Sequence, residues 1–397
     1  MVETNNPNSQ MGEIEFCTLG MFIIDDIEFG GSRPDVKNVL GGAASYAVVG
    51  ARLVAGAKHG RAVSWIVDMG SDFPSETLAV IKSWGTDCVI REDHSRLTTR
   101  AWNGYHPDEK RDFKYLTPKL RLEPFMLSDA QAWSRTFHMV CSPARCIFIV
   151  NEILQRREQL REAGKAPSTE HASERPIFVW EPVPDLCTPE EQEKFFEANR
   201  VVDVVSPNHM ELGMMFDQPE WTVESEECEG LVRRILDAGI GPNKDGCIVI
   251  RAGKEGSYAY SGAQKLWLPA YHQPNTSGAT AVLDPTGAGN SFLGALAQGM
   301  VTAGREPFEV IESTLSPSES WKQAMESWGP RRDVLGALIC ATVAAGYVVE
   351  QIGVPQISVA NGKELWNQTE FTERVRLYTQ RLFKTLQESP QRHLLTN

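Results

Sequence analysis

The sequence carries little positive charge and no basic cluster. It has 39 lysines and arginines against 52 aspartates and glutamates, which gives a formal net charge of −13 at pH 7. Proteins that bind nucleic acids contact phosphates through clustered lysine and arginine side chains. The most basic stretch here, Arg331 with Arg332, is only two residues long. We therefore expect no nucleic-acid-binding surface.

Long apolar runs and ordered cysteine spacings are missing too. No uninterrupted apolar run approaches the roughly 18 to 20 residues of a membrane-spanning helix, and the polar N-terminus lacks the apolar core of a signal peptide. The eight cysteines show no metal-binding spacing, and we interpret most of them as small buried hydrophobic residues. These absences predict a reduced, soluble, cytoplasmic protein that does not contact membranes.

Short apolar stretches alternate with amphipathic ones along most of the chain. Residues 16–25 and 62–70 indicate buried strands, whereas residues 41–56 and 74–85 indicate helices. Strands that alternate with helices predict a mostly parallel sheet covered on both faces. Residues 98–118 interrupt the alternation and indicate a two-stranded excursion with a polar tip. The pattern predicts a single α/β domain with a small lid.

A glycine-rich turn at residues 286–289 is a candidate anion site. Gly287 and Gly289 allow the backbone to approach an anion, and the helix expected from about residue 290 directs its positive end there. Tight packing between a strand and a helix would explain the same glycines. Asp284, just before the turn, either helps to order a cation or caps the turn.

Two further motifs stand where strands are expected to end. Asn208 and Glu211 lie three residues apart at a helix start and face the same way. They can hold magnesium through water, but an ordinary capping pair has the same spacing. Asp25, at the end of the first expected strand, would lie in the ligand crevice and suits the paired hydroxyls of a sugar. For Asp26 we favour exposure to solvent.

In order and spacing, these motifs resemble those of the ribokinase/pfkB family of carbohydrate and nucleoside kinases. The resemblance extends from about Phe16 to Pro355 and includes "GGAASYAVVGARL", "PNHMEL", "RAGKEGSYAY" and "DPTGAGNSFLGAL". It implies a Rossmann-like three-layer sandwich with a mostly parallel central sheet and a small β-lid. It also implies transfer of the γ-phosphoryl group of magnesium-ATP to a hydroxymethyl group of a sugar, nucleoside or related small molecule.

The resemblance assigns roles to individual residues. Substrate contacts are implied for Asp25, Gly41, Gly42 and Tyr46. Nucleotide contacts are implied for Asn208, Arg251, Gly253, Gly256, Thr286, Gly287 and Gly289. Catalytic positions are implied for Gly287, Ala288, Gly289 and Asn290. Magnesium is implied at Glu211, with Asn208 acting through water, and a monovalent cation such as K⁺ at Asp284.

The expected parts of the chain follow from the same resemblance. They are a disordered tail (1–15), a kinase domain (16–370) with a lid (about 27–40 and 98–116) and an insertion (about 305–332), and a C-terminal helical tail (371–397). A homodimer through the lid is an expected assembly. Trp321 and Trp328 in the insertion would suit a partner surface or, equally well, a tethered peripheral helix.

The sequence departs from the family pattern at Asn290, where the family usually has the aspartate that takes the hydroxyl proton. The resemblance is closest to a divergent fungal-type branch in which asparagine is tolerated. An amide does not accept a proton at neutral pH, and a positioned base typically supplies about 10² to 10⁴ in rate. Asp25 could substitute as the base, and Asn290→Asp is expected to raise turnover about 10-fold or more.

The acceptor side departs from the family as well. Tyr46 stands where the family usually has asparagine, and Ile23 replaces a polar residue sometimes found before the substrate aspartate. Both changes make the expected pocket less polar, so a plain pentose or hexose would lose hydrogen-bond partners. Two functions therefore remain open: a small-molecule kinase with an unusual acceptor, or a nucleotide-binding pseudokinase that acts as a scaffold or regulator.

Overall fold

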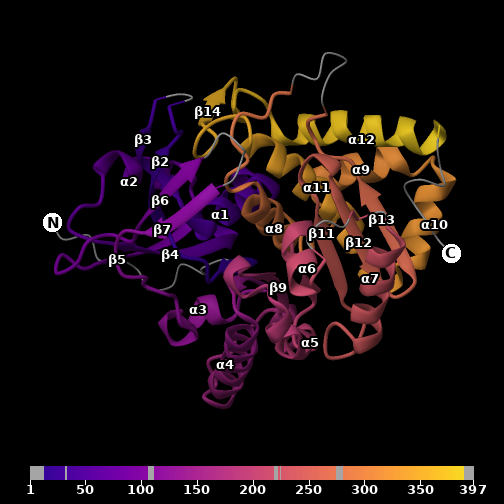
Figure 1. Cartoon of the computed structure of the whole chain (residues 1–397), viewed down its shortest axis with the longest axis horizontal. Coiled ribbons are helices and arrows are strands. Elements are labelled where there is room, and N and C mark those ends of the chain that lie inside the picture. Colours follow the sequence, from indigo (N-terminus) through magenta and orange to yellow (C-terminus); the bar gives the residue numbers. More distant parts are fainter. Residues whose placement is uncertain are drawn as a thin grey trace.

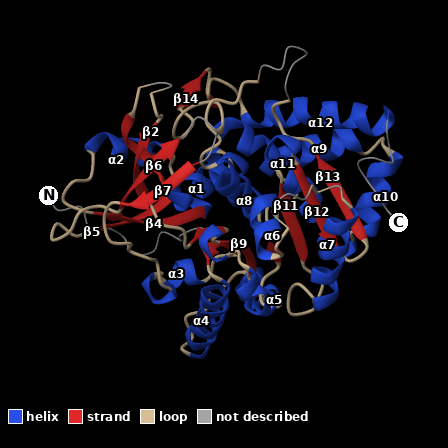
Figure 2. Ribbon diagram, viewed as in Figure 1, coloured by secondary structure: helices blue, strands red, loops and turns tan. Residues whose placement is uncertain are grey.

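A large β-sheet forms the centre of the protein (Figures 1 and 2). The computed structural model describes residues 13–31, 34–105, 111–218, 222–223, 225–273 and 280–388. Within these ranges the sheet has nine strands in the order β13-β12-β11-β10-β9-β8-β1-β4-β5. The strands from β11 to β5 are parallel to their neighbours, and β12 and β13 continue the sheet in antiparallel pairing. The predicted mostly parallel α/β sheet is confirmed.

The bounds of the nine strands show how short most of them are. They are β1 (Phe16–Thr18), β4 (Val63–Met69), β5 (Asp87–Glu92), β8 (Thr136–Cys141), β9 (Ile177–Pro182), β10 (Val204–Val205), β11 (Cys247–Arg251), β12 (Ser257–Ser261) and β13 (Gln264–Leu268).

Helices cover both faces of this sheet (Figure 2). Successive side chains of a strand point to opposite faces, so Val179 of β9 joins one hydrophobic core, whereas Phe178 and Trp180 join the other. The first core includes residues of α1 (Gly42–Ala55), α2 (Ser75–Ser83), α8 (Ala288–Gly299), α9 (Glu306–Leu315), α10 (Glu319–Ser327), α11 (Asp333–Val348) and α12 (Phe371–Glu388). The second includes residues of α4 (Pro143–Glu162), α5 (Gln192–Asn199), α6 (His209–Met215) and α7 (Glu226–Ala238). The short α3 (Asp129–Ala132) contacts α4.

A second, four-stranded sheet has the order β3-β2-β6-β7. Its strands are β2 (Ile23–Glu28), β3 (Val36–Gly41), β6 (Arg100–Tyr105) and β7 (Arg111–Tyr115), and a separate hairpin is formed by β14 (Ile357–Ala360) and β15 (Lys363–Trp366). The prediction of a single strand over residues 16–25 is wrong, because β1 ends at Thr18 and β2 of the second sheet begins at Ile23. Between the two strands lies Gly20. A Cβ atom there would lie 2.8 Å from the backbone nitrogen of Ala44. Asp25 therefore lies inside β2 of the second sheet instead of at the end of β1.

The structure also changes our expectations for the terminal and inserted segments. Residues 1–12 and 389–397 lie outside the described residues. Glu15, which we had assigned to a disordered tail, is buried, and it accepts hydrogen bonds from Gln298 and Arg305. In the insertion, Trp321 and Trp328 are buried in the first core. This burial favours the interpretation of the insertion as a packed peripheral helical segment.

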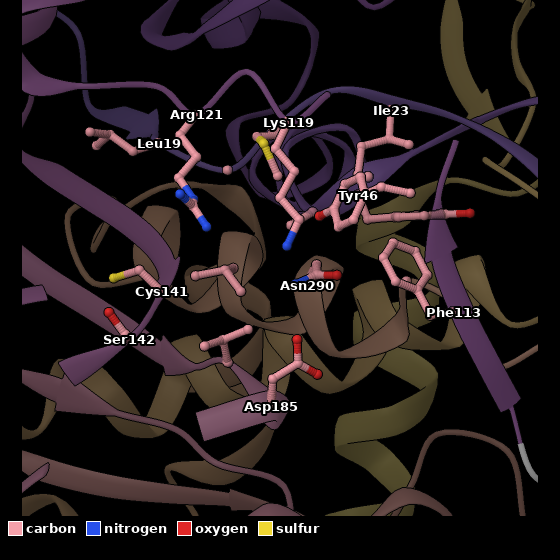
Figure 3. A pocket seen from close by; sticks show the side chains of 18 of the residues that line it. Leu19, Ile23, Tyr46, Phe113, Lys119, Arg121, Cys141, Ser142, Asp185 and Asn290 are labelled. Atoms are coloured by element: carbon pink, nitrogen blue, oxygen red, sulfur yellow. The ribbon is translucent and has the colours of Figure 1, made fainter. Parts of the chain in front are cut away.

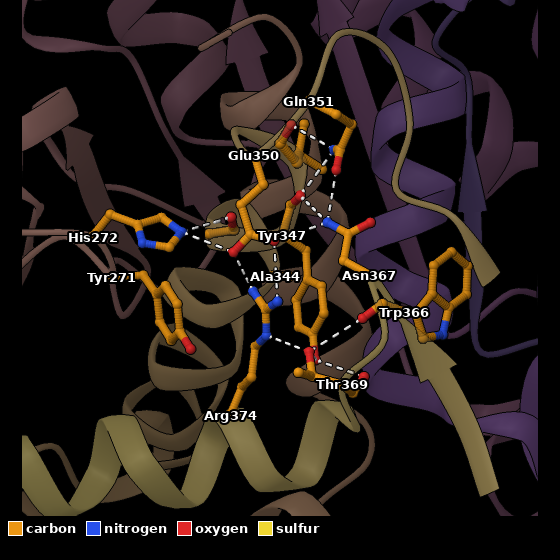
Figure 4. Close-up of polar contacts among 12 residues, drawn as sticks. Tyr271, His272, Ala344, Tyr347, Glu350, Gln351, Trp366, Asn367, Thr369 and Arg374 are labelled. Atoms are coloured by element: carbon orange, nitrogen blue, oxygen red, sulfur yellow. Dashed lines mark hydrogen bonds and ion pairs between the residues drawn. The ribbon is translucent and has the colours of Figure 1, made fainter. Parts of the chain in front are cut away.

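A polar network fastens α12 to the end of α11 (Figure 4). The carboxylate of Glu350 binds the guanidinium of Arg374, with N–O distances of 2.5 and 3.0 Å. It also accepts a hydrogen bond from Asn367, and His272 Nε2 lies 3.0 Å from it. Burial acts to raise the pKa of Glu350, but these hydrogen bonds outweigh it and lower the pKa to about 2.

No helix among the described residues has both the length and the apolar character needed to cross a membrane.

Two glycines bring α1 and α8 into backbone contact. A Cβ atom at Gly50 would lie 1.9 Å from the carbonyl oxygen of Ser291, and one at Gly294 would lie 1.9 Å from that of Ala47. Both distances are far shorter than atoms can approach, so any larger residue would push the helices apart. The close crossing holds the start of α1 next to the start of α8.

Candidate functional site

A cavity of about 580 Å³ lies at the carboxyl ends of the central strands (Figure 3). Its walls come from the loops after β1 and β8, from β2 and β7 of the small sheet, and from the starts of α1, α4 and α8. In sheets of this kind, ligands bind beyond the carboxyl ends of the strands. The cavity is therefore the first place to look for the predicted residues.

The residues expected to contact the substrate meet at this cavity. Asp25, Gly42 and Tyr46 line it, and Asp25 is only 4% exposed. Gly41 does not line the cavity but leaves room for the carboxylate, because a Cβ atom there would lie 1.9 Å from Asp25 Oδ2. Asp26 points elsewhere, and its Oδ1 accepts a hydrogen bond from the backbone of Asn38.

The glycine-rich turn forms the start of α8 and reaches the same cavity. Gly287 is the N-terminal capping residue of α8 and has φ +80°, a left-handed conformation that favours glycine. A Cβ atom on Gly287 would lie 2.3 Å from the ring of Tyr46. The ring of Tyr46 thus packs directly on the turn. Asp284 accepts a hydrogen bond from the backbone of Thr286 at 2.9 Å, which is the turn-capping role.

Arg251 joins this turn to two buried glutamates. A Cβ atom on Gly289 would lie 2.2 Å from Arg251 Nη1, so the guanidinium lies against the first turn of α8. Nη1 is 2.8 Å from Glu181 Oε1, and Nη2 is 3.3 Å from Glu211 Oε2. The backbone carbonyl of Ser206 accepts a further hydrogen bond at 2.9 Å. The guanidinium therefore lies beside the turn that the sequence predicted as an anion site, but its charge is already balanced by Glu181 and Glu211.

Glu181 is a residue of this site that the sequence analysis missed. Asn290 Nδ2 donates a hydrogen bond of 2.6 Å to Glu181 Oε2, so a carboxylate lies directly beside the asparagine. Burial acts to raise the pKa of Glu181, but Arg251 and His138 outweigh it and keep the pKa below its ordinary value. Glu181 is the second-to-last residue of β9 and lies at the carboxyl edge of the sheet. A glutamate at the end of an otherwise apolar strand was the signal in the sequence that could have identified it.

Asn208 and Glu211 form the capping pair that was one of the two interpretations of their spacing. Asn208 Oδ1 accepts from the backbone of Glu211, and Glu211 Oε2 accepts from the backbone of Asn208, both at 2.7 Å. Burial raises the pKa of Glu211 to about 7, although Arg251 acts in the opposite direction. Among the described residues, no three His, Cys, Asp or Glu side chains are grouped so that they could hold a metal ion.

The remaining nucleotide-contact candidates lie beside this pair. Asn208 forms a parallel β-bridge with Arg251, which places the start of α6 next to the turn after β11. Gly253 (φ +56°) and Gly256 (φ +90°) belong to that turn. A Cβ atom on Gly256 would lie 2.0 Å from the carbonyl oxygen of Leu268, so close packing between β12 and β13 already requires a glycine here.

Comparison with known proteins yields a family, relatives and solved structures. The model of the pfkB family carbohydrate kinases matches residues 180–353. Protein MAK32 of Saccharomyces cerevisiae is 34% identical over an alignment of 377 residues that covers 91% of this chain and 91% of that one. The structure of ribokinase from Giardia lamblia superposes with a TM-score of 0.62 at 16% identity, covering 94% of this chain and all of that one. A putative ribokinase II from E. coli, in complex with ATP and Mg²⁺, gives 0.57 at 16% identity and covers 92% of this chain and 99% of its own.

Proposed function

Because this chain belongs to the pfkB family of carbohydrate kinases, we propose that it transfers the γ-phosphoryl group of ATP to a hydroxymethyl group of a sugar-like small molecule. One observation carries the proposal. The glycine turn at the start of α8 and the buried carboxylate of Asp25 face a single cavity. The proposed phosphate site and a hydroxyl-binding group thus line one reaction space.

The turn at residues 287–289 is suited to hold the transferred phosphoryl group. Gly287 and Gly289 have no side chain that could block the first backbone amides of α8, and the helix directs its positive end toward them. The guanidinium of Arg251 lies beside Gly289 and would add a donor there if the phosphoryl group displaced Glu181 or Glu211 from it. Preorganised donors and charges of this kind stabilise the negative charge that phosphoryl transfer distributes over the equatorial oxygens.

Asn290 acts in this proposal as a positioning residue. Its Nδ2 donates to Glu181, which leaves Oδ1 to accept a hydrogen bond from the acceptor hydroxyl. Since the lowered pKa keeps Glu181 ionised at neutral pH, the amide is held in one orientation. Phosphoryl transfer has a loose transition state and depends mostly on positioning and charge stabilisation. A slow kinase without a strong base at residue 290 follows.

Metal ions enter the proposal only together with the nucleotide. Mg²⁺ usually binds one or two carboxylates together with substrate phosphates, and Glu211, with Asn208 acting through water, is the pair that could support it. Mg²⁺ bound there would neutralise phosphate charge. Glu211 already binds Arg251 and the backbone of Asn208, so the protein side of this site is weak. The contact of Asp284 with Thr286 explains that aspartate as a turn cap, and we include no K⁺.

A second function is favoured by the polar contacts around Arg251. The guanidinium lies between Glu181 and Glu211, and Asn290 is tied to the same cluster. If these contacts persist when a nucleotide binds, the chain would hold ATP without transferring its phosphoryl group. A nucleotide-binding pseudokinase that acts as a scaffold or regulator is the alternative.

Thermal stabilisation by ATP and Mg²⁺, followed by ATP turnover on an acceptor panel, tests both functions. Gly289→Asp places a negative charge and a side chain in the proposed phosphate site. Gly230→Asp is the matched control, since a Cβ atom at Gly230 meets no heavy atom within 4 Å. We expect ATP to stabilise the parent and the control but not Gly289→Asp. Equal stabilisation of all three would place the nucleotide elsewhere. ATP binding without turnover on any sugar, sugar acid, sugar phosphate or nucleoside would favour the pseudokinase.

A further inference from the structure

We infer that the acceptor carries a negative charge, as a phosphate or carboxylate group on a sugar or polyol, and that Lys119 and Arg121 bind this group. The inference rests on the proposed function, because it concerns the acceptor side of the same cavity. It goes beyond that function by naming the chemical class of the acceptor and the residues that select it.

Lys119 and Arg121 reach into the cavity from the segment that follows β7 (Figure 3). Both side chains are solvent-exposed through the cavity. In the part of the chain that the structure describes, neither forms an ion pair with a carboxylate. The ammonium group of Lys119 lies 4.3 Å from the centroid of the Tyr115 ring, which supports it at the cavity wall. Two cations thus face the cavity without an ion-pair partner, although the whole chain carries a net charge of −13.

The neighbouring wall reinforces this positive character. The 20-residue helix α4 begins at the cavity, because its N-terminal capping residue, Ser142, lines the cavity wall. The positive end of the α4 dipole therefore faces the same space. Arg145 also lines the cavity, but its guanidinium binds Glu123 at 2.8 Å and the carbonyl of Leu122 at 2.7 Å. Arg145 is therefore already neutralised, and the unneutralised cations are those at residues 119 and 121.

The cavity also contains two acidic groups, which come from other segments of the chain than Lys119 and Arg121. Asp25 is buried next to Gly41 at the small sheet. Asp185 comes from the loop after β9, and its carboxylate points into the cavity (Figure 3). Carboxylates suit the hydroxyl groups of a sugar, whereas lysine and arginine bind phosphate and carboxylate through charge-assisted hydrogen bonds. An acceptor with hydroxyl groups and one anionic group matches both the carboxylates and the two cations of this cavity.

A neutral sugar matches this cavity less well. Ile23 and Tyr46 line it, and the aliphatic side chain of Ile23 offers no hydrogen bond to hold a neutral ligand. An anionic group supplies the missing binding energy through Lys119 and Arg121. The alternative is that these cations contact the phosphates of ATP, and the experiment must separate the two cases.

Direct binding in the absence of ATP tests the inference. Paired ligands would be measured by calorimetry: hexoses and pentoses against their terminal phosphates, and against the corresponding aldonic acids. We expect at least one anionic ligand to bind about 10-fold or more tightly than its neutral partner, and to weaken as the salt concentration rises. The phosphate and acid arms show which anionic group the cavity prefers.

Charge-removing variants identify the residues. Lys119→Gln and Arg121→Gln should each weaken the anionic ligand by about 10-fold, and together by about 100-fold, since one charge-assisted contact is lost each time. Neutral ligands and ATP should change by less than about 2-fold. Lys82→Gln with Arg332→Gln is the control, because these exposed residues lie outside the cavity lining and the pair removes the same charge.

Each outcome decides the inference separately from the proposed kinase activity. An anionic ligand that binds through Lys119 and Arg121 but is never phosphorylated would support the inference and contradict the kinase. Turnover of a neutral acceptor that both variants leave unchanged would support the kinase and overturn the inference. A loss of ATP affinity in the variants, or a parent that binds no anionic ligand of the panel, would overturn it as well.

Discussion

The hydrogen bond between Asn290 and Glu181 allows the prediction that can be worked out furthest. Asn290 Nδ2 lies 2.6 Å from Glu181 Oε2, and Asn290→Asp would replace this donor with a second carboxylate oxygen. With both carboxyl groups ionised, the variant would have no donor here and would lose a hydrogen bond to a charged group, which contributes about 1.5–3 kcal/mol. Two carboxylates this close do not both stay ionised, so one of them must take up a proton.

The loss of stability in Asn290→Asp depends on pH, because one carboxyl group must bind a proton in the folded protein. Keeping a carboxyl group of ordinary pKa (about 4) protonated costs about 4 kcal/mol at pH 7 and about 1.4 kcal/mol at pH 5, at 1.36 kcal/mol per pKa unit. An acid whose pKa is raised by folding removes stability as the pH rises above its unfolded pKa. We therefore expect Asn290→Asp to lower the free energy of unfolding by about 3–4 kcal/mol at pH 7 and by about 1 kcal/mol at pH 5.

Urea unfolding at pH 5, 6 and 7 measures this difference. The double variant Glu181→Gln with Asn290→Asp reverses the hydrogen bond, and the two changes should couple favourably by about 2 kcal/mol or more. Asn151→Asp, on the exposed face of α4, is the control for the added charge. If the loss in the free energy of unfolding does not depend on pH, or if the two substitutions do not couple, the contact between Asn290 and Glu181 is refuted. The structure also revises our expectation for turnover: the double variant, and not Asn290→Asp alone, should be the faster kinase.

Three further predictions concern other contacts. Gly289→Ala should displace the guanidinium of Arg251, because its Cβ atom would lie 2.2 Å from Nη1, and a thermal shift should then show weaker stabilisation by ATP. Gly294→Ala should cost about 3 kcal/mol or more by overpacking α8 on Ala47, which chemical denaturation would reveal; a neutral effect would contradict the close crossing. Glu350 has a pKa of about 2 in the folded protein, so its stabilisation is complete above its unfolded pKa of about 4.5 and is lost toward pH 2. After discounting for its partial exposure, Glu350→Gln should remove about 1–2 kcal/mol at pH 7 and little at pH 2.

The sequence predicted those parts of the fold and the cavity that depend on local patterns. Alternating strands and helices place helix starts at one edge of the sheet, which was enough to bring Gly42 and Gly287 to a common cavity. Asp25 reaches the same cavity from β2 of the small sheet, which the local pattern did not predict. The contact between Glu181 and Asn290 joins side chains 109 residues apart, and no local pattern specifies such a pairing. Magnesium binding and capping require the same spacing of Asn208 and Glu211, so only the hydrogen bonds in the structure distinguish the two.

The glycine-dependent crossing of α1 and α8 has a consequence for how this protein can be redesigned. Gly50 and Gly294 lock the two helices together, so the part of the cavity that carries Tyr46 cannot be changed without disturbing the phosphate turn. β3 runs directly into α1, and Ile24 and Leu40 of the small sheet share the core of the helix pair, whereas β7 and the segment that bears Lys119 lie at the other edge of that sheet. New acceptor specificities should therefore be engineered by changing β7 and this segment, while the helix pair and the strands next to it are kept as an invariant frame.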